Sequence, residues 1–133
     1  MTLTPLTPQM RSVVRKWIKT LRSGKYEQGR GRLRYSFDNT MRYCCLGVLC
    51  DINLPANAEW IEKPNPLSPL DTAYSLFGEY FTTPPEIEEN IGKIQTHFMD
   101  WSGLSLIGLN DVEGATFDEI ADMLDLWLLD TAK

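Results

Sequence analysis

Basic side chains follow a glycine-rich segment in the first third of the chain. Residues 24–31 contain three glycines, and Arg30, Arg32 and Arg34 occupy alternate positions from within this segment onward. On a β-strand, this spacing places three guanidinium groups on one face. Arginine binds phosphate oxygens through paired hydrogen bonds, and glycine allows backbone amides to approach an anion. The pattern predicts a site for a phosphorylated ligand, although its spacing matches neither a Walker P-loop nor a Rossmann fingerprint.

Aromatic and polar residues complete the predicted site. Tyrosines lie close to the arginines in the sequence, and a tyrosine ring can stack on a base. A later Asn-Asp pair could bind polar groups of a sugar or base if its segment folds over the arginines. The predicted ligand-binding residues are Lys25, Tyr26, Arg30, Arg32, Arg34, Arg42, Tyr43, Asn110 and Asp111. A solvated basic hairpin is the alternative interpretation of the same arginines.

The cysteines and the single histidine exclude several kinds of site. Cys44, Cys45 and Cys50 lack the paired spacing of zinc ligands, and His97 has no second histidine to join it on a metal. We expect the cysteines to be small buried residues in a reducing compartment. Acidic residues between 111 and 122 could in principle bind a divalent ion, but two of them suit a helix N-terminus better. No cofactor, metal or catalytic residue is therefore predicted.

The net charge of −5 hides a division between the two ends of the chain. Residues 1–50 hold ten of the thirteen basic residues and two acidic ones, whereas residues 51–133 hold three basic and sixteen acidic residues. This division is typical either of separate surfaces for an anionic ligand and a basic partner, or of two halves that pack together and neutralise each other. Direct nucleic-acid binding is less favoured than binding of a small anionic ligand or of a host protein, because the acidic part of the chain would repel the polymer.

Helical periodicity is clearest at the two ends of the chain. Thr7-Pro8 predicts a helix start and Gly24 a stop, and Thr116 with Glu119 fits a capping box. A further helix is expected from 82–86 to Gly103. The predicted buried stripes are Met10, Val14, Trp17, Ile18 and Leu21; Ile87, Ile91, Ile94 and Phe98; and Phe117, Ile120, Leu124 and Leu128.

The middle of the chain predicts a small β-structure. Asp38-Asn39 indicates a turn between a strand that carries the arginines and a returning strand at 41–45. Residues 45–50 form an unbroken apolar run that must be buried, and residues 104–109 suggest a strand or buried coil. Four prolines make residues 53–72 an irregular surface excursion. The predicted fold class is α+β, with three main helices packed on a small antiparallel hairpin or sheet in a single domain of residues 1–133.

Composition is that of a globular protein, with 43% apolar and 23% charged residues. No apolar run is long enough for a membrane span, and residues 1–5 lack a basic-then-apolar export signal. We therefore expect no membrane association.

Three segments of the chain together form a distinctive pattern. The first runs from Leu21 to Tyr26 and adds Gln28-Gly29, and the second, residues 43–51, reads Tyr-Cys-Cys-Leu-Gly-Val-Leu-Cys-Asp. The third is Leu109-Asn110-Asp111 with Gly114, Thr116-Phe117 and residues 119–122. The arginine triplet and the proline-rich segment are not part of this pattern. The pattern resembles that of a group of small, uncharacterised proteins encoded by tailed bacteriophages and prophages. This resemblance implies a virus-encoded accessory protein in the cytoplasm of an infected bacterial host.

Two functions follow as hypotheses. In the first, the protein binds and sequesters a phosphorylated small molecule, such as a nucleotide signal made by a host defence system, and leaves it chemically unchanged. A homo-oligomer is a companion expectation, since such proteins often build pockets between subunits. In the alternative, the acidic C-terminal surface, with Asp118, Asp122 and Asp125, blocks a host defence protein.

Overall fold

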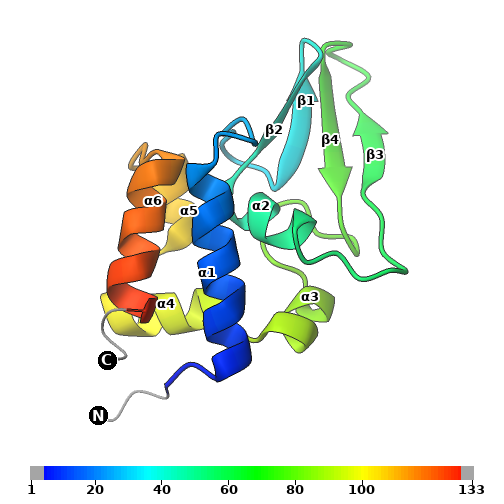
Figure 1. Ribbon diagram of the computed structural model, residues 1–133. Helices are drawn as coiled ribbons and strands as arrows, with labels where there is room; N and C mark the ends of the chain where they lie inside the picture. Colours follow the sequence, from blue (N-terminus) through cyan, green and yellow to red (C-terminus); the bar gives the residue numbers. More distant parts are fainter. Residues whose placement is uncertain (1–4, 130–133) are drawn as a thin grey trace.

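The computed structural model describes residues 5–129 and has an α+β fold (Figure 1). Residues 1–4 and 130–133 lie outside this range. The expectation that the N-terminus lacks an export signal concerns residues 1–5, most of which are therefore not described. Within the described range are six α-helices and one π-helix, rather than the three main helices predicted, and an antiparallel sheet of four strands, which agrees with the predicted hairpin or sheet. The helices are α1 (Pro8–Arg22), α2 (Cys45–Asp51), α3 (Pro85–Ile91), α4 (Ile94–Ser102), α5 (Leu106–Asp111), α6 (Phe117–Leu124) and the π-helix η1 (Asp125–Leu129). The strands are β1 (Arg34–Phe37), β2 (Thr40–Tyr43), β3 (Ile61–Pro64) and β4 (Asp71–Ser75).

Both terminal helical predictions are confirmed. The Thr7 hydroxyl caps α1 by accepting a hydrogen bond from the Met10 amide at 3.1 Å, and the five predicted apolar residues of α1 are buried. Helix α6 begins with the predicted capping box between Thr116 and Glu119. These elements were predictable because their signals lie within a few residues of one another.

The sheet has the strand order β2-β1-β4-β3 and contains the predicted hairpin. Asp38 and Asn39 form its turn, with φ of 50° and 65°. The strand begins at Arg34, however, so Arg30 and Arg32 precede it, and the expected row of three arginines along one strand is wrong. The returning strand ends at Tyr43 and not at residue 45.

The prediction of an irregular excursion at residues 53–72 is wrong for residues 61–64 and 71–72, which form strands. This segment supplies strand β3 and the start of β4, which extend the hairpin to four strands. All four residues of β3 are exposed, so no alternation of apolar and polar residues marks it as a strand. Pro64 ends β3 at the edge of the sheet, where a missing amide hydrogen is tolerated.

Two helical regions differ from the sequence predictions. The single helix expected up to Gly103 is divided into α3 and α4 at Gly92, whose φ is 90°. A Cβ on Gly92 would lie 2.8 Å from Met10 Cγ, so the glycine also permits close packing on α1. Residues 104–109, expected as a strand or coil, contain most of helix α5, which the Ser105 hydroxyl caps through the Gly108 amide at 3.1 Å.

The apolar run at residues 45–50 is buried as predicted and forms helix α2. Its packing depends on Gly47, because a Cβ there would overlap the carbonyl oxygen of Leu33. The indole Nε1 of Trp17 donates to the Cys45 carbonyl at 3.0 Å and ties α2 to α1. Helix α2 therefore lies at the centre of the molecule, where the helices meet the sheet.

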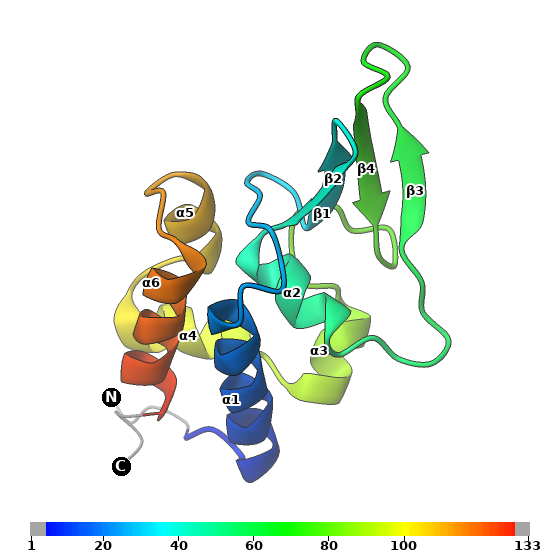
Figure 2. The ribbon, with the colours of Figure 1, turned by 45° about the horizontal axis from the view of Figure 1, so that its top comes forward.

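The sheet projects from one end of the helical body. Figures 1 and 2 show α1, α4, α5 and α6 grouped together, with α2 at the base of the sheet and no helix covering either sheet face. The largest fully buried side chains include Trp17, Phe98 and Leu46, all of which belong to helices. Within residues 5–129, no helix has the length and apolar character needed to cross a bilayer. In the sheet, β3 is exposed, whereas most residues of β1, β2 and β4 are half-buried.

Candidate functional site

The two faces of the sheet separate the residues that the sequence grouped together. Directly opposed residues on antiparallel strands point to the same face. One face carries a row across all four strands: Arg42, Tyr35, Ala73 and Lys63. The other face carries the row Tyr43, Arg34, Tyr74 and Glu62. Arg34 and Tyr43 therefore lie on the opposite side of the sheet from Arg42.

Arg34 is enclosed by aromatic rings. Its guanidinium carbon lies 4.3 Å from the ring centre of Tyr74, 5.5 Å from that of Trp60 and 5.6 Å from that of Tyr43. Its Nε donates to the sulfur of Met41 at 3.2 Å. Cation–π contacts hold this arginine in place and link the base of β3 to the rest of the sheet.

A carboxylate lies behind this aromatic group. Asp51, at the end of α2, accepts hydrogen bonds from the Tyr26 hydroxyl and from the Trp60 indole. Burial and the neighbouring Asp51 raise the pKa of Tyr26, and the same two causes raise the pKa of Tyr43. Tyr26 and Tyr43 thus join the sheet to α2 as neutral side chains beside a negative charge. This face is less suited to an anion than the sequence suggests.

The side chain of Asn110 forms a buried hydrogen-bonded hub. Its Oδ1 accepts from the Cys45 amide at 3.2 Å and from Gln28 Nε2 at 3.0 Å. Its Nδ2 donates to the Gly29 carbonyl and to Asp111 Oδ1, both at 2.8 Å. Asn110 is 0% exposed and uses both amide protons and both acceptor positions. Its prediction as a ligand-binding residue is corrected, because all of its hydrogen-bonding capacity is taken within the protein.

Gln28 extends the hub to α6. Its Nε2 also donates to the Ala115 carbonyl at 2.8 Å, and its Oε1 accepts from the Phe117 amide at 3.0 Å. The Asn-Asp segment therefore does fold against the glycine-rich segment, as the sequence hypothesis required. Residues 27–31, here called the glycine loop, are fixed by contacts with residues more than 80 positions away.

The glycine loop does not offer its amides to an anion at Gly29 or Arg30. The Gly29 amide donates to the Tyr43 carbonyl at 2.7 Å, and the Arg30 amide donates to the Tyr35 hydroxyl at 3.3 Å. Gly29 is needed for packing, since a Cβ there would lie 2.6 Å from Tyr35 Cε1 and 2.9 Å from Arg42 Cβ. At Gly29 and Arg30, an anion must therefore be bound by side chains.

Two arginines flank the glycine loop without acidic partners. Arg42 Nη1 lies 3.5 Å from the Gln28 carbonyl, and the exposed Arg30 reaches toward Gly114. Among the ion pairs of residues 5–129, none involves Arg30 or Arg42. Asp111 is connected to the same loop by the Asn110 side chain, whose Nδ2 donates both to Asp111 Oδ1 and to the Gly29 carbonyl. We call Arg30, Tyr35, Arg42 and Asp111 the loop site.

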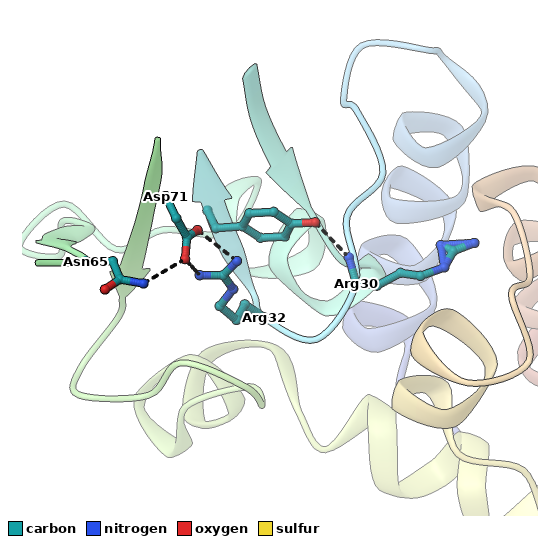
Figure 3. Close-up of polar contacts among 5 residues, drawn as sticks. Arg30, Arg32, Asn65 and Asp71 are labelled. Carbon is teal, nitrogen blue, oxygen red and sulfur yellow. Dashed lines mark hydrogen bonds and ion pairs between the residues drawn. The ribbon is translucent and has the colours of Figure 1, made fainter. Parts of the chain in front are cut away.

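Arg32 is held in place beside the loop site. Its guanidinium carbon lies 4.1 Å from the ring centre of Tyr35, and its two terminal nitrogens contact the carboxylate of Asp71 at 3.0 and 3.2 Å. Figure 3 shows this pair, with Asn65 on the far side of Asp71 and the Arg30 side chain pointing away from Arg32. The hydrogen bond from Arg32 holds the pKa of Asp71 below its ordinary value.

A pocket of about 240 Å³ adjoins this pair, where Arg32 and Asp71 meet Lys63, Asn65 and Ala73. The sequence did not suggest Lys63, Asn65 or Asp71, since all three lie in the segment expected to be irregular. Only the pairing of β3 with β4 brings them beside the arginines.

Lys25 and the charged helix faces lie apart from this region. Lys25 is exposed, and its amide donates only to the neighbouring Ser23 hydroxyl. Arg22 of α1 pairs with Asp122 of α6 at 2.7 Å, and Arg15, Lys19 and Arg22 line a groove with Asp125. The basic and acidic parts of the chain thus neutralise each other at this contact, which was one of the two interpretations of the charge division.

The cysteines are buried, as expected. All three are free thiols, and burial raises the pKa of Cys44 to about 11. Within the described part of the chain, no three His, Cys, Asp or Glu side chains gather closely enough to hold a metal ion.

Comparison with known families places the chain in one of them. The model of a family described as Domain of unknown function (DUF8296) matches residues 10–127. The chain belongs to this family. The match runs from α1 into η1 and so includes the hub, the glycine loop and the whole sheet. No curated protein and no solved structure matches the chain.

Proposed function

We propose that the protein binds and sequesters a phosphorylated small molecule of the nucleotide class at the loop site. The observation that carries this proposal is the pair of arginines, Arg30 and Arg42, which flank a rigidly held loop without a carboxylate partner among the described residues. A guanidinium group has five N–H donors in a planar array that matches phosphate oxygens.

The fixed loop supports this proposal energetically. Binding costs less when the receptor is already ordered, and the hub of Gln28 and Asn110 holds the glycine loop in one conformation. Tyr35 contributes to this order through its hydrogen bond with the Arg30 amide. The arginines therefore start from a backbone that needs no rearrangement.

Asp111 gives the site a second type of contact. Its Oδ1 accepts from Asn110, which orients the carboxylate beside the loop. A carboxylate in this place accepts hydrogen bonds from a ribose hydroxyl or a base amino group, whereas the arginines bind phosphate. This combination favours a nucleotide over inorganic phosphate.

The resemblance to phage-encoded proteins supplies the setting of the proposal. In the cytoplasm of an infected host, a protein that binds a nucleotide signal and leaves it intact would lower the concentration of that signal. A recovered ligand of unchanged mass is therefore part of the expected result.

Isothermal titration with adenosine and guanosine 5′-monophosphates tests the proposal. We expect Arg42→Gln to weaken binding about tenfold, since it removes a charge-assisted hydrogen bond. Arg34→Gln is the matched control, because Arg34 comes from the same hairpin but lies on the opposite face. Thermal unfolding of both variants shows whether the fold is intact.

Three results would overturn the assignment. Binding lost in Arg34→Gln and kept in Arg42→Gln would place the ligand on the aromatic face of the sheet. No binding of either nucleotide at millimolar concentration would exclude purine mononucleotides as ligands of the loop site. A ligand recovered in altered form would make the protein an enzyme.

A further inference from the structure

We infer that the ligand of this protein carries two separated phosphate groups, as a linear or cyclic dinucleotide does, and that Lys63 binds the second. This inference rests on the proposed function, because it takes the loop site as the place of the first phosphate. It adds a second cationic point at the other edge of the sheet.

The register of the sheet places the two points on one line. Arg42 on β2, Tyr35 on β1, Ala73 on β4 and Lys63 on β3 are directly opposed in turn, so they form one row on one face. Neighbouring strands lie about 4.8 Å apart, so three intervals separate the backbones of Arg42 and Lys63 by roughly 14 Å. Side chains that lean inward shorten this span.

The surface between these points suits an extended ligand. Ala73 is the smallest side chain of the row, and the pocket of about 240 Å³ opens beside it. Tyr35 and the Arg32 guanidinium above it occupy the centre of the row, where an aromatic ring or an arginine plane can stack with a base. None of the helices within residues 5–129 covers this face (Figure 2).

The charges on this face are arranged for a ligand with two separated anionic groups. Asp71 neutralises Arg32 at the centre, whereas Lys63 and Arg42 have no ion-pair partner among residues 5–129. Lys63 is exposed, and its ammonium lies 5.9 Å from the ring centre of Tyr80. Unpaired positive charge thus remains at the two ends of the row, which is the pattern that two separated phosphates complement.

The test compares ligands with one and two phosphates on the same protein. The probes are adenosine and guanosine 5′-monophosphates, the 5′-phosphorylated dinucleotides pApA and pGpG, and the corresponding cyclic dinucleotides, each titrated at several salt concentrations. We expect a dinucleotide to bind about tenfold more tightly than the monophosphate, from one additional charge-assisted contact. Its affinity should also fall more steeply with salt. The preferred form distinguishes a linear from a cyclic ligand.

Variants separate this inference from the proposed function. Lys63→Gln should remove the advantage of the dinucleotide and leave monophosphate affinity within about twofold. Arg42→Gln should weaken both ligands. Lys93→Gln, which removes an exposed lysine between α3 and α4, is the control and should change neither.

The outcomes identify which statement fails. A dinucleotide that binds no more tightly than a monophosphate, or an advantage that survives Lys63→Gln, overturns the second phosphate point but leaves the loop site in place. An absence of binding by all probes, or binding that Arg42→Gln does not affect, overturns both proposals.

Discussion

Replacing Asn110 by alanine separates a structural role of this residue from a ligand-binding role. In the structure, Asn110 is 0% exposed and makes four hydrogen bonds that join α5 to α2 and the glycine loop. Alanine leaves the Cys45 amide and the Gly29 carbonyl without these partners. Gln28 Nε2 keeps its second partner, the Ala115 carbonyl.

The expected loss follows from the two buried groups. Each buried donor or acceptor left without a partner costs about 1–3 kcal/mol, so Asn110→Ala should lower the free energy of unfolding by roughly 2–6 kcal/mol. Domains of this size are stable by about 5–15 kcal/mol, so the variant should be marginally folded. Urea unfolding followed by circular dichroism measures the difference. Asn57→Ala, at an exposed position, is the control and should change stability by less than about 0.5 kcal/mol.

A double-mutant cycle with Gln28→Ala tests the contact itself. Because Gln28 and Asn110 share a hydrogen bond, their losses should not add. Asn110→Ala with unchanged stability and abolished nucleotide binding would refute the structural role. The sequence prediction of Asn110 as a ligand-binding residue would then be right.

Two other changes test the packing and the electrostatics of the fold. Gly47→Ala should destabilise the protein by about 3 kcal/mol or more, because the new Cβ would overlap the Leu33 carbonyl. Gly108→Ala is the control: its Cβ meets only ordinary contacts, so the substitution should be neutral or slightly stabilising. Urea unfolding measures both variants. Equal effects of the two glycine substitutions would contradict this packing. The pKa of Asp71 lies below its ordinary value of 3.8 because of the hydrogen bond from Arg32. The ion pair therefore stabilises the fold fully at pH values above 3.8, and this stabilisation is lost as the pH falls through the lowered pKa. Asp71→Asn should therefore be less stable at neutral pH and less sensitive to acid, and unchanged pH–stability curves would show that the pair with Arg32 is not formed.

The sequence predicted those elements whose signals are local. Helix α1 needs only the Thr7-Pro8 start and an apolar stripe, both within one helix length. Strand β3 has no such signal, since all of its residues are exposed and its position is set by pairing with β4. The break at Gly92 likewise depends on the approach of Met10 from a distant helix. Local sequence patterns report the secondary structure that a segment favours by itself, and they do not report the tertiary contacts that change it.

The site was harder to predict because it depends on sheet register. Alternation along one strand suggested that Arg30, Arg32 and Arg34 share a face, but the strand starts only at Arg34. The residues that do share the face with Arg42 include Lys63, which comes from a strand the sequence did not reveal. Residue types near the glycine loop were predictable, whereas their division between two faces required the pairing of all four strands.

The hub also decides which part of the glycine loop can bind an anion. Glycine-rich loops usually bind phosphate through free backbone amides, but here the Gly29 amide is used by the Tyr43 carbonyl and the Gly29 carbonyl by Asn110. Binding therefore falls to the guanidinium groups of Arg30 and Arg42, which are partly or fully solvated. Contacts of this kind weaken with salt because they release counterions and are screened. The hydrogen bonds that hold the loop rigid also occupy the Gly29 backbone, so binding depends on solvated arginines. We therefore expect nucleotide affinity to fall strongly as the salt concentration rises.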